Sequence, residues 1–400
     1  MRALARLADA WLAPCSPWMR LARQRIPKAS PFSPAMTEAC LRATFVGWTL
    51  PAVARWAHDD LPPLLRRRAG GGCVRGGRAG EVLIILPSTV FAAAWQAAAT
   101  VWLAGGVPAF RPSRREPIFS ELLAASARAV GGRDLPARVL HPGVLVRRRK
   151  RFRAAVVYGS DDTVRRIREG WEKEFRVFGF GPQVGAAWIS RRALSRPSVR
   201  ETACRLAQDV VLYDTQGCLS PACVFVERGG AMSPEAFAAF LEKEVARLDR
   251  ALPSRVEDAD ARESFLQLWR FRASQRRARI FGRRVILHRE RDSHPSGLRR
   301  TVFVRPVAGA AEAARLCARW PVRLAALAVA DATDVPRARR AFQRFRNLWV
   351  TGIGVMQSPP PSWRNGGVNL LAELAAAGSR TMKNNPRTPT RRRRSKSSKR

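Results

Sequence analysis

Residues 82–110 carry no charged side chain, although 26% of the residues in the whole chain are charged. A transmembrane helix needs only about 20 apolar residues, so length alone would permit a membrane span here. Pro87, Gln96 and the sequence Gly105-Gly106-Val107-Pro108 interrupt the segment, however. We therefore expect a buried strand at 82–86, a turn at 87–89, a helix at 91–103 and a second short strand at 107–110. A continuous apolar strand followed by an apolar helix is typical of a parallel sheet covered on both faces.

Strands and helices continue to alternate beyond this segment. Short apolar runs predict strands at 144–146 and 154–158, and periodic apolar positions predict helices at 118–129 and 163–171. A second unit follows, with a helix that begins at Ser233-Pro234 and strands at 301–304 and 324–329. This pattern predicts an α/β fold with mostly parallel sheets. Because 400 residues are too many for one ordinary core, we expect two domains.

The chain is strongly basic, with 72 basic and 31 acidic residues and a formal net charge of +41. Nearly all of the basic residues are arginines, which fits the coding bias of a GC-rich genome as well as selection for phosphate binding. Aromatic residues do not alternate with the basic runs as they do in proteins that bind single strands. Nucleic-acid binding therefore stays only as an alternative function. A basic surface would also attract the phosphates of coenzyme A or NADP.

The cysteines and histidines do not form the pattern of a disulfide framework or a metal site. Seven cysteines are scattered without a CxxC pair, and the four histidines lie far apart. The first 27 residues contain five arginines and no long apolar stretch, which argues against a secretory signal. We therefore expect a cytoplasmic protein with no metal and no membrane span.

One cysteine stands apart from the others. Cys218 follows Gly217 in a polar turn between two apolar runs, where glycine lets the backbone approach a ligand closely. Successive N–H groups in such a turn can also face an anion. Cys223 alternates with apolar residues in the second run and is expected to be structural. For Cys218, the local sequence leaves a structural and a reactive role both open.

The same segment resembles a known family. Asp-Thr-Gln-Gly-Cys-Leu-Ser-Pro at 214–221, followed by an apolar run that ends in Glu227, is similar to the nucleophile loop of LuxC-type long-chain fatty-acyl-CoA reductases. These enzymes form a branch of the aldehyde dehydrogenase superfamily and supply aldehyde to bacterial luciferase. The resemblance continues in order from about residue 35 to about residue 375. It includes the segments at 36–42, 82–119, 158–161 and 354–366.

The resemblance implies NADPH-dependent reduction of a fatty acyl-CoA to the aldehyde through an acyl-enzyme on Cys218. Gln216 in the same loop and Ser88 in the turn at 87–89 are the further catalytic candidates. Many aldehyde dehydrogenases place an asparagine near that turn as an oxyanion donor, and we find no clear match for it. Ser88, Thr89 or the Cys218 backbone N–H would then donate instead. The glutamate that activates water in the hydrolytic relatives also has no counterpart at 180–185.

Three residues are expected to bind the cofactor. Gly159 and Ser160 end an apolar run and begin a helix, which is an arrangement that points backbone N–H groups at a phosphate. Arg111 stands where the superfamily usually has a lysine near the adenosine ribose. Because arginine can pair bidentately with a phosphate, it favours NADP over NAD. Coenzyme A enters as the thioester of the substrate.

The resemblance also divides the chain and suggests partners. The expected parts are amino-terminal helices with a glycine-rich connector (1–80), a Rossmann-like cofactor domain (81–190), a catalytic domain (191–340), a segment returning to the cofactor domain (341–380) and a disordered basic tail (381–400). Expected partners are further copies of the chain and an acyl-protein synthetase or acyl-transferase of a fatty-acid reductase complex. Alternative functions are another acylating aldehyde dehydrogenase, a degenerate inactive copy, or a basic nucleic-acid-binding protein.

Overall fold

The computed structural model describes residues 1–61, 80–87, 90–140, 151–255, 259–290, 295–296 and 298–380. The strand expected at 144–146, the turn residues Ser88 and Thr89, and the basic tail lie outside the described residues. None of the helices in the described part of the chain is both long and apolar enough to cross a lipid bilayer.

The first sheet contains five parallel strands in the order β3-β2-β1-β4-β5. They are β1 (Glu81–Ile85), β2 (Val107–Arg111), β3 (Arg138–Val139), β4 (Phe152–Tyr158) and β5 (Arg176–Phe180). Helices α6 (Phe91–Leu103), α7 (Ile118–Gly131) and α9 (Asp161–Trp171) connect them, with the short turn η1 (Gly132–Asp134) before β3. The uncharged segment thus forms strand, helix and strand, as its sequence predicted.

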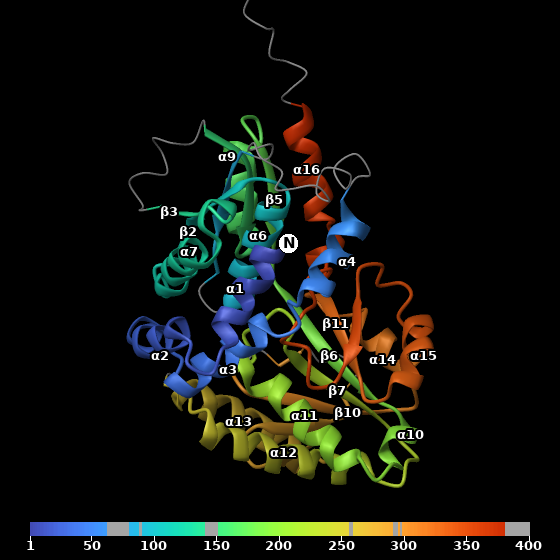
Figure 1. The fold of residues 1–400 in the computed structure, drawn as a ribbon. Coiled ribbons are helices and arrows are strands. Elements are labelled where there is room, and N and C mark those ends of the chain that lie inside the picture. The colour runs from blue at the N-terminus through green and yellow to red at the C-terminus, as the bar shows by residue number, and fades with distance from the viewer. Residues whose placement is uncertain are drawn as a thin grey trace, which may run out of the picture.

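Of the four amino-terminal helices within residues 1–61, α1 (Arg2–Leu12) and α2 (Pro17–Ala29) pack against α7, α3 (Pro34–Phe45) packs against α6, and α4 (Leu50–Asp60) packs against α1 (Figure 1). Each of the last three begins at a Ser or Thr whose oxygen accepts a backbone N–H, with proline in the first turn. Aromatic rings join α1 and α3 to α6: the ring centroids of Trp11 and Phe45 are 5.0 Å apart, and those of Phe45 and Trp95 of α6 are 4.9 Å apart.

The second sheet contains seven strands in the order β12-β11-β6-β7-β10-β9-β8, and only the β8–β9 pair is antiparallel. They are β6 (Gln183–Ile189), β7 (Pro221–Glu227), β8 (Ala278–Phe281), β9 (Val285–His288), β10 (Val302–Val307), β11 (Arg323–Val329) and β12 (Trp349–Gly352). The strands expected at 301–304 and 324–329 are confirmed.

Helices cover both faces of this sheet (Figure 1). Val224 and Val226 of β7 pack in one core with α11 (Val199–Val211) and α12 (Pro234–Ala251). Cys223 and Phe225 alternate with them and pack on the opposite face with α14 (Ala310–Cys317) and α15 (Val335–Ala341). The short helix α10 (Arg191–Leu194), the longer α13 (Ala259–Ser274) and the turn η4 (Ala332–Asp334) complete this unit.

The chain changes from one sheet to the other between β5 and β6. Only residues 181–182 separate Phe180 of the first sheet from Gln183 of the second, whereas the sequence suggested a boundary near residue 190. The carboxy-terminal segment belongs to both units. Its β12 pairs with β11, and its last helix α16 (Leu370–Arg380) packs against α6 and β4.

Candidate active site

A sharp turn presents Cys218. Helix α11 ends at Val211, and in the following turn η3 (Leu212–Thr215) three successive residues have positive φ angles: Tyr213 (57°), Asp214 (54°) and Thr215 (60°). The left-handed conformation is unfavourable for residues other than glycine, so this turn must be held by its surroundings. The first apolar run of the motif is therefore the end of a helix, and the turn after it leads through Gln216, Gly217 and Cys218 into β7.

Buried polar contacts hold the turn in place. Asp214 is fully buried and accepts a hydrogen bond from Arg300 Nε at 2.6 Å and another from Ser254 Oγ at 3.1 Å. Arg300 is also buried and pairs in addition with Asp249. Its backbone N–H donates to Thr215 Oγ1 at 3.0 Å. Since breaking a buried ion pair leaves a charge without its partner, these contacts restrict the turn to one conformation.

The closing motif meets the cysteine turn. Asp209, near the end of α11, is buried, and its carboxylate accepts hydrogen bonds from the backbone N–H groups of Gly354 (2.6 Å) and Met356 (2.9 Å). Gln357 Nε2 donates to Ser220 Oγ at 3.0 Å. A Cβ atom on Gly217 would lie only 2.8 Å from Gln357 Oε1, so a larger residue at this position would displace the Gln357 side chain. Burial raises the pKa of Asp209 to about 7, although both N–H donors oppose this shift.

Cys218 lies on the wall of a cavity with a volume of about 310 Å³. Its wall includes the carboxyl ends of β4 and β5 (Tyr158, Phe180), the two residues between β5 and β6, and the turn before β7. The remaining walls come from the start of α6 (Val90, Ala92, Ala93, Gln96) and from the carboxy-terminal segment (Gln357, Pro359, Trp363, Asn365). Burial raises the pKa of the Cys218 thiol to about 11, while its own backbone N–H acts in the opposite direction.

The lining of this cavity is electrically neutral. Among the described residues that line it, none is an Asp, Glu, Lys, Arg or His. This composition is unusual for a chain with 72 basic residues. A cavity of this kind suits an uncharged, largely apolar group.

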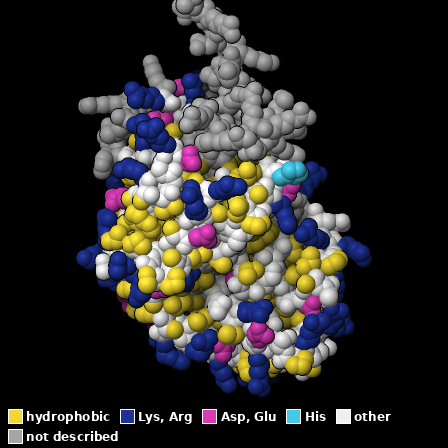
Figure 2. All heavy atoms as spheres, in the orientation of Figure 1, with side chains coloured by type: hydrophobic (Ala, Val, Ile, Leu, Met, Phe, Trp, Pro, Cys, Tyr) yellow, Lys and Arg dark blue, Asp and Glu magenta, His cyan; other side chains and the backbone are white. Residues whose placement is uncertain are grey.

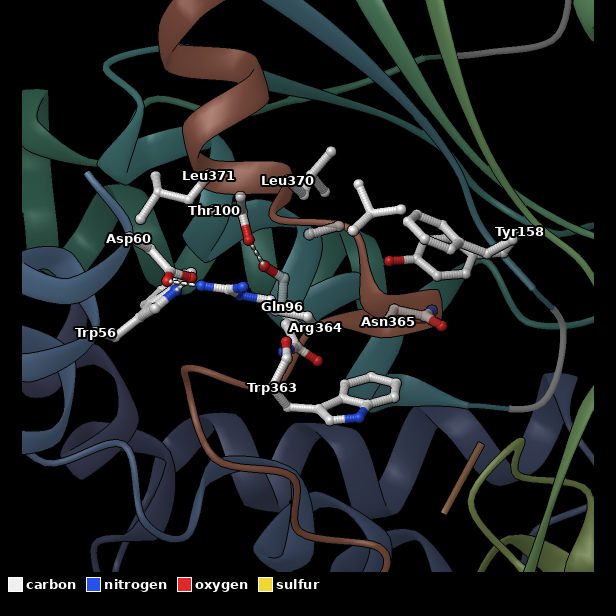
Figure 3. A pocket seen from close by; sticks show the side chains of 13 residues that line it. Trp56, Asp60, Gln96, Thr100, Tyr158, Trp363, Arg364, Asn365, Leu370 and Leu371 are labelled. Atoms are coloured by element: carbon white, nitrogen blue, oxygen red, sulfur yellow. Dashed lines mark hydrogen bonds and ion pairs between the residues drawn. The ribbon is translucent and has the colours of Figure 1, made fainter. Parts of the chain in front are cut away.

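A smaller cavity of about 30 Å³ adjoins the larger one and shares Gln96, Tyr158, Phe180, Trp363 and Asn365 with it. Figure 3 shows the Asp60–Arg364 ion pair on one side of it and Tyr158 on the other. Trp56 Nε1 also donates to Asp60, and Gln96 Nε2 donates to the Trp363 carbonyl at 2.8 Å. A volume this small has room for water but not for an acyl chain.

The comparisons with known proteins address the family directly. The family model described as "LuxC: Acyl-CoA reductase (LuxC)" matches residues 77–377. The chain belongs to this family. The resemblance stated from the sequence is thus confirmed over most of the chain. No match was found among curated proteins.

Solved aldehyde dehydrogenases share the fold of this LuxC-family chain. A putative aldehyde dehydrogenase from Burkholderia cenocepacia has a TM-score of 0.65 at 16% identity, covering 94% of this chain and 82% of its own. An NAD-dependent aldehyde dehydrogenase from Sinorhizobium meliloti has a TM-score of 0.62 at 16% identity, covering 88% and 74%. An NAD-dependent benzaldehyde dehydrogenase from Corynebacterium glutamicum has a TM-score of 0.58 at 14% identity, covering 89% and 82%. The predicted aldehyde-dehydrogenase-like α/β fold is confirmed.

The structure brings some of the predicted site residues together in the LuxC-family chain. Cys218, Gln216 and Gly159 all line the larger cavity. Ser160 does not line it: its Oγ accepts a hydrogen bond from Thr163 N and caps α9, whose first turn carries two aspartates. Arg111 ends β2 and donates to the Pro112 carbonyl at 3.0 Å, outside both cavities. Ser88 lies outside the described residues.

Several residues of the site were not found from the sequence. Tyr158 and Asn365 line the larger cavity, and Asp209 and Arg300 hold the segments around Cys218. Tyr158 directly precedes the Gly159-Ser160 pair, so its position next to that motif was a usable signal. Arg300 had no such signal, because it is distant from Asp214 along the chain and stands among many other arginines.

Proposed function

We propose that this protein reduces a long-chain fatty acyl-CoA to the fatty aldehyde with NADPH, through an acyl-enzyme on Cys218. Membership of the LuxC family and the aldehyde dehydrogenase fold support an oxidoreductase acting on acyl or aldehyde groups. The observation that carries the finer proposal is the neutral cavity that has Cys218 in its wall. In a cavity whose described lining holds no charged side chain, an apolar acyl group loses little solvation and meets no carboxylate that would activate water.

The nicotinamide cofactor fits the arrangement of the strands. In open parallel sheets, ligands bind outside the carboxyl ends of the strands. The carboxyl ends of β4 and β5 line the same cavity as the Cys218 turn, and Gly159 is the residue of the Gly159-Ser160 pair that reaches the cavity. When bound, the cofactor supplies a hydride. Arg111, at the carboxyl end of β2, remains our proposed contact for the adenosine ribose or its 2′-phosphate.

The residues of the chain would then act in the following order. Cys218, once deprotonated, adds to the thioester carbonyl, and coenzyme A leaves as its thiolate. The neutral walls keep the acyl group away from water until hydride reaches its carbonyl carbon. The anion of the thiohemiacetal that results on Cys218 then collapses to the free aldehyde and the Cys218 thiolate. Gln216, next to Gly217 in the same wall, is proposed to contact the acyl group.

The face of the molecule drawn in Figure 2 does not favour the nucleic-acid alternative. On the face shown in Figure 2, the Lys and Arg side chains are spread among apolar and acidic ones and do not form a continuous stripe. A protein that binds nucleic acid as its main function would concentrate them in such a stripe. Cytoplasmic location, assembly with further copies of the chain, and transfer of acyl groups from an acyl-protein synthetase or acyl-transferase remain proposals that follow from the family.

The test is an assay of NADPH oxidation with acyl-CoAs of graded chain length, from two carbons to sixteen. We expect turnover to increase toward the longer chains, with NADPH preferred over NADH. A maximum at the short chains would support another acylating aldehyde dehydrogenase. Absence of turnover with every acyl-CoA would support a degenerate copy and contradict the proposal.

A further inference from the structure

Tyr158 lies where the two cavities meet. It is the last residue of β4 and lines both cavities, and its ring stacks on Phe180 of β5 with the centroids 5.3 Å apart and the planes 27° apart. Figure 3 shows its hydroxyl oxygen directed away from the strand, toward the space beside Gln96 and Asn365, two residues that line both cavities. The neighbouring strand therefore fixes the ring, while the hydroxyl group stays available to a bound molecule.

Cys218 and Tyr158 are the only residues with an ionisable side chain among the described residues that line the larger cavity. The two groups interact: burial raises the pKa of Tyr158, and negative charge on Cys218 raises it further. The tyrosine hydroxyl consequently keeps its proton at neutral pH. It remains a hydrogen-bond donor when negative charge forms beside the cysteine.

Three of the five amide side chains in the wall, all except Gln216 and Asn365, donate an amide N–H to a partner within the protein. Gln96 donates to the Trp363 carbonyl at 2.8 Å, Gln183 donates to Asn365 Oδ1 at 3.1 Å, and Gln357 donates to Ser220 Oγ at 3.0 Å. The Tyr158 hydroxyl, in contrast, has no hydrogen-bond partner within the described part of the chain.

We propose that Tyr158 is a catalytic residue of the reaction assigned above: its hydroxyl donates a hydrogen bond to the carbonyl oxygen of the acyl group at Cys218. This inference rests on the proposed function. As the Cys218 sulfur forms its bond to the acyl carbon, the electron pair of the carbonyl π bond moves to the oxygen, where the Tyr158 O–H meets it. The electron pair on the oxygen then re-forms the carbonyl π bond. The bond between the acyl carbon and the coenzyme A sulfur breaks, and both of its electrons leave on that sulfur. The proton stays on Tyr158 throughout.

The same hydrogen bond serves the second half of the reaction. When the acyl carbon takes up the hydride that the bound cofactor would supply, the oxygen again carries the negative charge. Re-formation of the carbonyl then expels the Cys218 thiolate and releases the aldehyde. A donor aimed at the position where charge develops accelerates both halves, because the bond is stronger in the transition state than in the bound substrate.

The test is the substitution Tyr158→Phe, which removes the hydroxyl and keeps the ring stacked on Phe180. We expect kcat for acyl-CoA reduction to fall about 100-fold, the usual effect of removing one oxyanion donor, with little change in KM. Without NADPH, intact mass spectrometry should show slower formation of the acyl adduct on Cys218. The rate of Cys218 alkylation by iodoacetamide, a reaction without an oxyanion, should not change.

A matched control is Trp171→Phe, which shortens an aromatic side chain on the helix after Tyr158 but lines neither cavity. It should keep wild-type kcat. Turnover by Tyr158→Phe within threefold of the wild type would overturn the Tyr158 assignment and leave the proposed function standing. Equal losses in alkylation and turnover would also overturn it, because Tyr158 would then act through the thiol. A wild-type protein that forms no adduct and oxidises no NADPH would overturn both.

Discussion

The two neighbouring cysteines, Cys218 and Cys223, lie in different surroundings. Cys218 faces the cavity, whereas Cys223 is buried within β7 on the face that packs against α14 and α15. Cys218→Ser should therefore fold normally and lose most activity, since a hydroxyl is a much weaker nucleophile than a thiolate. Cys223→Ser should keep its chemistry but lose about 1–3 kcal/mol of stability, because it buries a hydroxyl among apolar side chains.

Both substitutions can be checked by urea unfolding together with NADPH oxidation. Because the pKa of the Cys218 thiol is about 11, alkylation of this residue in the free protein should accelerate nearly tenfold for each pH unit between about pH 7 and 10. A rate that levels off near pH 7 would show that the free protein already holds a thiolate, in disagreement with the burial of this group.

At the scale of elements, Asp209 joins α11 to the closing motif. Its pKa is about 7 in the folded protein and about 3.9 in an unfolded chain. A group whose pKa is higher in the folded state stabilises the fold fully when the pH is below its pKa in the unfolded chain. This stabilisation decreases as the pH rises toward its pKa in the folded protein. Asp209→Asn removes this dependence. The loss of stability caused by the substitution should thus be larger at pH 5 than at pH 8, by about 1.4 kcal/mol for each pH unit from 5 up to 7.

The measurement is the difference in unfolding free energy between the wild type and Asp209→Asn at several pH values. Other buried acids with raised pKa values, such as Glu116 and Glu242, are common to both proteins and cancel. A difference that does not change with pH would mean that Asp209 is ionised in the fold. In that case, the two N–H donors would lower the pKa of Asp209 by more than burial raises it.

The elements show what could be predicted from the sequence and what could not. The strand, helix and strand within residues 82–110 followed from apolar continuity and from Pro87 and Gly105, which are local signals. The left-handed turn at Tyr213, Asp214 and Thr215 had no local signal, because it lacks glycine and depends on Arg300, which is distant in the chain. Cys218 could be found because its turn resembles a family motif. Tyr158 could be recognised as a site residue only from the cavity, which forms only when the two sheets meet.

At the scale of the whole molecule, residues 349–377 connect the two sheets. Within this segment β12 extends the second sheet, α16 packs on α6 and β4, and Gln357, Trp363 and Asn365 form part of the cavity wall. The ion pair between Arg364 and buried Asp60 joins the segment to α4 as well. A chain without this segment would expose apolar surface on both units.

Two truncated chains, compared with each other, test the role of residues 349–377. A chain that ends at residue 380 keeps every described contact of the segment and the whole range matched by the family model, so we expect wild-type solubility, unfolding and turnover. A chain that ends at residue 348 should bind the dye ANS, lose cooperative unfolding and show no turnover, because it loses the edge strand, the α16 cover and four residues of the larger cavity together. Measured side by side, the two proteins differ only in residues 349–380. If the shorter one unfolded cooperatively without binding the dye, each sheet would be stable without the segment, and its role would be confined to the cavity.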